Sequence, residues 1–443
     1  MLHSTEEILT RIERLLTDSP AARTSVVWCE ERAGSAGHGG RARPPGQTFS
    51  RTVVVGVEEA GRTGTCAVAS DDPAFLLMAV REALAAARLD PGPPWGPPPP
   101  SEAGEEGPPL HDPGLAALTP EAAARRLAGL LEKRGSGQLS WWEARLVVAD
   151  SRGLRRAAAL TAGVLELRWG RRVGAGHAAH AARSLAGLDP EGVAARARSR
   201  HPGADLEEGG LAPGEAPAVV LAGEAAARLL AAFSAAAFDG HAYAAGDSWL
   251  ARGGGELLLS PLLDVEDDPL SAAGLPLPFD FEGRPKGRHP LLVRGRPGPP
   301  VTDAALAARI GQAETAHALG GGAALPLHPR LAPGEGSEEE LRRAAEGGIW
   351  IGEVGPPELF DRVRLGTRLV ARGVRRIGPD GALAEPLADL GWEGELGELF
   401  GAVAGVGRES VCRPAGGGWL GGAVAPALRL SRLAGLYPLA PRG

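Results

Sequence analysis

The chain has 443 residues, of which 44% are hydrophobic and 23% charged, and its formal net charge is −7. This length allows two or three domains with apolar cores. The acidic balance argues against general nucleic-acid binding, which depends on a basic surface. No stretch approaches the ~20 consecutive apolar residues of a membrane-spanning helix.

The first 90 residues predict an α+β domain. Residues 1–20 hold an amphipathic helix pattern rather than a signal peptide, with Ser4 and Glu7 as a capping box. Strands are expected at 24–31, 51–58 and 65–69, and a helix at 71–89. The three cysteines, Cys29, Cys66 and Cys412, are too far apart for a CxxC metal site and odd in number. A reducing, cytoplasmic location is therefore expected.

Residues 91–114 predict a linker, because their many prolines exclude a helix or a central strand. A middle α/β region follows at 115–205. Its expected elements are helices at 119–133 and 189–200 and strands at 144–150 and 154–169.

Residues 215–443 predict a β-rich C-terminal domain. Its candidate strands are 256–263, 290–294, 348–354, 362–372 and 427–433. The sequence from Gly378 to Gly381, GPDG, predicts a turn inside a hairpin. The complete chain is thus expected to be an α+β protein.

The domain opens with PAVVLAGEAAARLLAAFSAAAFDG at 217–240, a strand followed by an alanine-rich helix. This order resembles the segment in which TldD/PmbA-family peptidases carry a zinc-binding HExxxH. Aligned without a gap, the two histidines fall on Ala231 and Ala236 and the glutamate on Ala232. Alanine offers no donor for a metal and no carboxylate to activate water.

Further stretches resemble the same family in the same order. They are GRTG at 61–64, DSRG at 150–153, FDFEGRP at 279–285, the glycines at 320–322, and Cys412 before GGGWLGG. The resemblance implies a curled antiparallel sheet around a central alanine-rich helix. It also implies that Cys412 occupies the position of the third zinc ligand. One cysteine cannot hold a catalytic zinc alone, so no metal or catalytic residue is expected here.

This pattern resembles the TldE (PmbA) side of the family, in which a homologue without the metal motif pairs with a catalytic TldD-type subunit. The resemblance implies a heterodimer whose zinc lies in a partner that carries HExxxH. The implied substrate is an extended, flexible peptide, such as a leader or precursor segment of a peptide natural product. Neither nucleic acid nor membrane is an expected partner.

Two alternatives remain open. A repurposed peptide-modifying enzyme would use the same cavity, with Asp239, His241 and Cys412 as a substitute site, and a non-enzymatic scaffold would only bind peptides. Cys412 also fits a simple packing role, since free cysteines are often buried.

Other polar residues have simpler interpretations. His177 and His180 are expected on the surface, and Ser234 is expected to bond back to a helix carbonyl. The acidic residues at 264–268 are expected at a solvated loop end.

Overall fold

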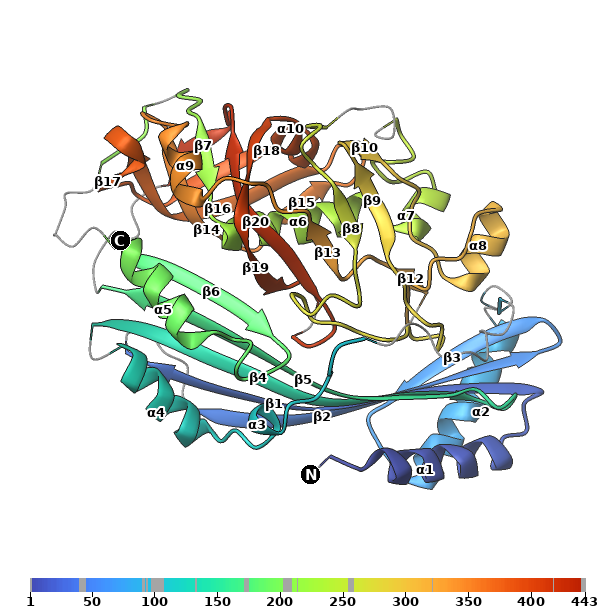
Figure 1. Cartoon of the computed structure of the whole chain (residues 1–443). Coiled ribbons are helices and arrows are strands. Elements are labelled where there is room, and N and C mark those ends of the chain that lie inside the picture. Colours follow the sequence, from blue (N-terminus) through green and yellow to red (C-terminus); the bar gives the residue numbers. More distant parts are fainter. Residues whose placement is uncertain are drawn as a thin grey trace.

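The computed structural model describes residues 2–39, 45–89, 92, 95–96, 107–131, 134–170, 175–201, 209–212, 214–253, 259–320, 322–416 and 418–439. More than half of the predicted linker 91–114 lies outside these ranges. Two large sheets with covering helices confirm the predicted α+β class (Figure 1). Within the described ranges, no helix is long and apolar enough to cross a membrane.

The first sheet has six antiparallel strands in the order β3-β2-β1-β4-β5-β6. Its strands are β1 (Arg23–His38), β2 (Gly46–Glu59), β3 (Arg62–Val68), β4 (Gly135–Asp150), β5 (Arg155–Trp169) and β6 (Gly176–Ala182). β1 pairs with β4 from Ser25 opposite Asp150 to His38 opposite Gly137. The regions expected at 1–90 and 115–205 therefore contribute to one sheet.

Helices cover one face of this sheet. They are α1 (Thr5–Asp18), α2 (Pro73–Leu89), α3 (Pro113–Ala116), α4 (Pro120–Leu131) and α5 (Pro190–Ser199). The predicted capping box is confirmed, because Ser4 and Glu7 exchange side-chain and backbone hydrogen bonds at the start of α1. α1 and α2 pack over one end of the sheet, and α3, α4 and α5 pack over the other.

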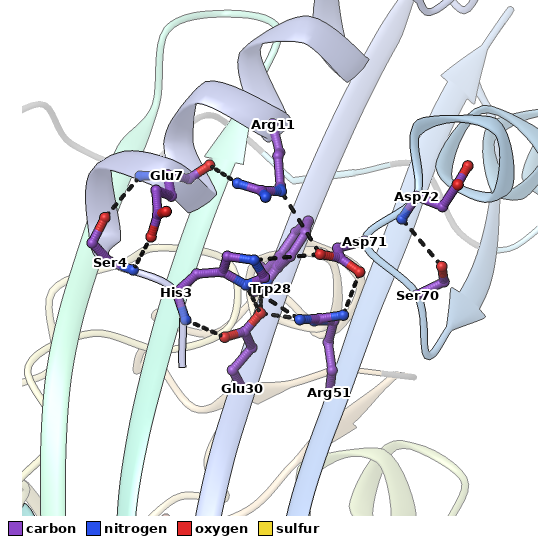
Figure 2. A network of polar contacts seen from close by, with 10 residues as sticks. All are labelled: His3, Ser4, Glu7, Arg11, Trp28, Glu30, Arg51, Ser70, Asp71 and Asp72. Atoms are coloured by element: carbon purple, nitrogen blue, oxygen red, sulfur yellow. Dashed lines mark hydrogen bonds and ion pairs between the residues drawn. The ribbon is translucent and has the colours of Figure 1, made fainter. Parts of the chain in front are cut away.

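A buried polar network fixes the N-terminus to this sheet (Figure 2). The Glu30 carboxylate on β1 accepts hydrogen bonds from the His3 backbone N–H at 2.9 Å, Arg51 Nε at 2.7 Å and Trp28 Nε1 at 3.1 Å. Arg51 also forms an ion pair of 2.5 Å with Asp71, just before α2. The buried carboxylate is satisfied within the protein, so we assign this network a structural role.

Within the part of the chain that the structure describes, the second sheet has thirteen strands. They are β7 (Val219–Leu221), β8 (Val265–Asp267), β9 (His289–Val293), β10 (Arg296–Pro297), β13 (Pro329–Leu331), β14 (Ile349–Val354), β15 (Glu358–Asp361), β16 (Gly366–Ile377), β17 (Leu383–Pro386), β18 (Leu390–Glu395), β19 (Val403–Pro414), β20 (Gly422–Leu430) and β21 (Leu436–Pro438). Most pairs are antiparallel, but β7–β14 and β13–β20 are parallel, so the sheet is mixed.

The remaining elements complete the C-terminal region. They are α6 (Gly223–Ala237), α7 (Gly240–Ala244), α8 (Ala304–Ile310), α9 (Glu338–Arg343), α10 (Leu396–Gly401), and the small sheet of β11 (Ala318–Leu319) and β12 (Ala323–Ala324). The predicted turn is confirmed as a 3-10 turn at Pro379–Gly381 between the paired strands β16 and β17. The strand predicted at 256–263 is wrong for its described part, because residues 259–263 form a turn.

The C-terminal region lies against the face of the first sheet that α1 and α4 leave uncovered (Figure 1). Leu146 and Leu160 of the first sheet share an apolar core with Leu275, Trp419 and Val424 of the C-terminal region. The two parts therefore bury apolar surface against each other, which favours a fixed arrangement.

Candidate functional site

Helix α6 lies in the C-terminal core, where it packs mainly against β20, β19 and β14. Its alanine and leucine content favours a helix even though Ala222 provides no side-chain cap. One face packs into the largest apolar core through Leu229, Leu230 and Phe233. The opposite face is half-buried.

The three alanines that the sequence alignment assigns to the expected HExxxH positions lie on the half-buried face. Ala231, Ala232 and Ala236 are each partly accessible, and Arg228 precedes them by one turn on the same face. The face thus consists of methyl groups and one guanidinium, and it offers no atom that could bind a metal ion.

A cavity of about 260 Å³ lies between the first sheet and this helix. Its lining comes from three parts of the fold: Gln138, Ser140, Trp142, Val164 and Glu166 from the first sheet, Arg228 from α6, and Arg413, Pro414 and Gly418 from β19 and the loop after it. The cavity therefore requires both halves of the chain.

Two arginines give this cavity its charge. Arg413 is 4% exposed and forms an ion pair of 2.5 Å with Glu166. Arg228 is half-buried and has no hydrogen bond or ion pair among the described residues. The sequence analysis missed both residues, although Arg228 is the single charged side chain within the alanine run at 225–237.

Cys412 lies in the apolar core between the two sheets rather than on the helix face. Its side chain is fully buried beside Leu275 and Trp419, and its backbone N–H donates to His180 Nδ1 at 3.2 Å. Burial raises the pKa of the Cys412 thiol to about 12, so it stays protonated at neutral pH. This environment matches the packing interpretation.

Asp239 and His241 have separate partners at the C-terminal end of α6. Asp239 caps α7 by accepting from the Ala242 backbone N–H at 3.0 Å, and His241 Nε2 lies 2.6 Å from an Asp303 oxygen. The structure does not bring these two residues together with Cys412. Across the described part of the chain, no group of three or more His, Cys, Asp or Glu side chains is placed to hold a metal ion.

The two histidines expected on the surface are in strand β6, and the expectation is wrong for His177. His177 is 4% exposed, because β6 contacts β19, β14 and α6 of the C-terminal region. Burial lowers the pKa of its imidazole, so the ring is neutral near pH 7.

The expectation of a solvated acidic loop end at 264–268 is wrong for Asp267 and Asp268, which are buried, whereas Asp264 and Glu266 are exposed. Asp267 is fully buried on β8, where it accepts from His317 Nε2 at 3.0 Å and from the His328 backbone N–H at 2.6 Å. Ser234 is fully buried, and its hydroxyl finds no hydrogen-bond partner in the described chain, so the expected bond back to a helix carbonyl is not formed.

Comparisons of this chain with known proteins point consistently to one family. The sequence profile of the PmbA/TldA metallopeptidase C-terminal domain matches residues 213–434. No curated protein matches the chain significantly.

Several solved structures share the fold over nearly the whole chain. A proposed modulator of a DNA gyrase from Thermotoga maritima is 19% identical, with a TM-score of 0.79 over 98% of this chain and 100% of that one. TldE from Thermococcus kodakarensis is 20% identical, with a TM-score of 0.78 over 97% and 99%. A proposed modulator of DNA gyrase from Bacteroides thetaiotaomicron is 16% identical, with a TM-score of 0.74 over 99% and 100%.

Proposed function

This chain belongs to the PmbA/TldD metallopeptidase family, and from that premise we propose that it is a non-catalytic subunit that helps a catalytic partner to cleave flexible peptides. The proposal rests on the half-buried face of α6, where Ala231, Ala232 and Ala236 occupy the positions that the resemblance to the family assigns to the HExxxH motif. A peptidase zinc needs about three protein ligands and an activated water.

The donor set of this chain does not fit such a zinc. Alanine replaces both histidines and the glutamate, and the Cys412 thiol is buried in an apolar core and protonated. No hydrolytic step is therefore assigned to this chain. By resemblance to the TldE side of the family, the zinc belongs to a TldD-like partner with an intact HExxxH.

A subunit without the metal still has a role in substrate binding. The alanine face of α6 and the cavity lined by Arg228 would offer an extended peptide a surface on which only Arg228 carries a long side chain from this helix. Backbone pairing to a sheet edge would give affinity with little sequence selectivity, which suits leader and precursor segments of peptide natural products.

The test is to purify the chain alone and together with a homologue that carries HExxxH. We expect the isolated chain to hold no stoichiometric zinc by metal analysis and to leave an unfolded peptide intact. Cleavage should appear with the partner, and native mass measurement should show a heterodimer. Chelator-sensitive cleavage by this chain alone would contradict the proposal, as would a stable self-dimer that ignores the homologue.

A further inference from the structure

The cavity beside α6 holds more positive charge than its own carboxylate neutralises. Glu166 is the only acidic residue among the described residues that line the cavity, and it forms an ion pair with Arg413. Arg228 is left with no hydrogen-bond or ion-pair partner in the described chain.

The charged groups just outside the cavity do not neutralise Arg228 either. Glu353 lies close enough to influence it but pairs with Arg168 at 2.6 Å. Arg372 adds a further positive charge nearby, and its own closest carboxylate is Asp389 at 3.8 Å. One cationic charge therefore remains uncompensated, in a chain whose overall charge is −7.

Arg413 supplies a second, independent sign of a missing ligand. Its side chain is 95% buried, and while Nη2 binds Glu166, the buried Nη1 has no hydrogen-bond partner in the described chain. Buried guanidinium donors are normally satisfied, because desolvation without a partner is unfavourable. An acceptor in the cavity would satisfy both arginines.

We propose that this cavity binds a carboxylate group of a peptide, held between the guanidinium groups of Arg228 and Arg413. The planar, fixed donors of arginine match the two oxygens of a carboxylate. Trp142, Val164 and Pro414 provide apolar walls for the adjoining part of the ligand. That the carboxylate belongs to a peptide rests on the proposed function, whereas the recognition of an anion rests on the cavity alone.

A carboxylate fits the charge of the cavity better than a phosphate does. Only one positive charge is uncompensated, because Glu166 already neutralises Arg413. A phosphate dianion would leave excess negative charge beside Glu166, whereas a monoanion balances the site. The carboxylate can come from a peptide C-terminus or from an Asp or Glu side chain.

The experiment measures binding of short labelled peptides to the purified full chain by fluorescence anisotropy, without the catalytic partner. One peptide has a free C-terminus, the second is its amidated form, and the third is amidated with one internal glutamate. We expect the free-terminus or the glutamate peptide to bind roughly tenfold or more tightly than the neutral one. The stronger of the two identifies the source of the carboxylate.

Variants locate the binding in this cavity. Arg228→Gln should reduce the affinity to that of the neutral peptide, whereas Arg126→Gln, at an exposed arginine on α4, should leave it unchanged. Glu166→Gln should increase the affinity, because Arg413 loses its competing carboxylate. Thermal unfolding in the presence of anions confirms that each variant is folded.

Equal binding of the three peptides, or unchanged binding by Arg228→Gln, would overturn the carboxylate site and leave the proposed function intact. A failure of all three peptides to bind would also overturn it. If inorganic phosphate displaced the labelled peptide more strongly than acetate at equal ionic strength, the proposal that the ligand is a carboxylate would be rejected. The cleavage assay with the HExxxH partner tests the proposed function separately.

Discussion

Arg200 and Glu224 form a buried ion pair between the end of α5 and the first turn of α6. One guanidinium nitrogen of Arg200 lies 3.0 Å from each oxygen of the Glu224 carboxylate. The side chains are 5% and 1% exposed. The pair thus connects the last helix on the first sheet to the central helix of the C-terminal region, and its loss should affect the stability of the whole chain.

Replacing one partner of this pair should be strongly destabilising. Glu224→Ala removes one of the two carboxylates that pair with the buried Arg200, whereas Glu338 stays at 2.7 Å. We therefore expect a loss of about 3 kcal/mol in the free energy of unfolding, at the lower end of the range for a broken buried pair. The double variant Arg200→Leu/Glu224→Leu should lose less, because neither charge of the pair is left behind and Glu338 keeps its ion pair with Arg342. Urea unfolding measures both. Glu121→Ala, at an exposed acidic residue in the first turn of α4, is the control and should cost less than about 1 kcal/mol.

The Glu224 carboxylate should also make the folded protein less stable in acid. Burial raises the pKa of Glu224, but Arg200 and His177 outweigh it and lower that pKa to about 2, below the ordinary 4.5. A lowered pKa means that the stabilisation is complete above pH 4.5 and disappears as the pH falls towards 2. We expect this group to contribute on the order of 3 kcal/mol across that window. Thermal unfolding at a series of pH values should show a flatter profile for Glu224→Gln, and parallel profiles would refute the assignment.

Cys412 should behave as a packed core residue. A thiol reagent should modify the partly exposed Cys66 in the folded chain, but should reach Cys412 only after unfolding. Cys412→Ser should destabilise by about 1–3 kcal/mol, because a hydroxyl would be buried without a partner, and Cys412→Ala should be milder. Cleavage by the complex with an HExxxH partner should not change with Cys412→Ala. Rapid labelling of Cys412 in the native protein would indicate an accessible, functional thiol instead.

Asp267 should be a stability determinant, in contrast to its neighbour on the same strand. Burial raises the pKa of Asp267, but hydrogen bonds with His317 and His328 prevail and hold it well below its ordinary range. Asp267→Ala should cost about 3–5 kcal/mol, since it removes the acceptor of two buried groups. Glu266→Ala, at an exposed position on β8, should stay within about 0.5 kcal/mol. Similar denaturation midpoints for the two variants would contradict this role.

Local patterns predicted most of the elements, because they depend on nearby residues. The alanine-rich run at 225–237 falls within α6, and the capping box at Ser4 marks the start of α1. The strand predicted at 24–31 is the first half of the longer β1, which continues through alanine, glycine and serine residues at 33–37. These have weak strand propensity, but they pair with β2 or β4, and that pairing is not encoded locally.

The buried polar residues were harder to predict, because their surroundings also depend on segments that are distant in sequence. Asp267 and His177 look like surface residues in their own segments, yet distant segments cover them and supply partners. Arg228 and Arg413 share a cavity although 185 positions separate them along the chain (413 − 228). The absence of donors at Ala231, Ala232 and Ala236 was visible only by alignment with a known motif. Side-chain periodicity alone contains no such information.

The pairing of β1 with β4 has a consequence for biosynthesis. While the ribosome is producing the first hundred residues, β1 has its partner β2, but its other edge is open until β4 emerges. An unpaired edge with alternating buried side chains can join strands of other chains. Translation through the proline-rich segment that precedes β4 is therefore the interval in which the nascent chain most needs a chaperone, and truncated products that end there should aggregate.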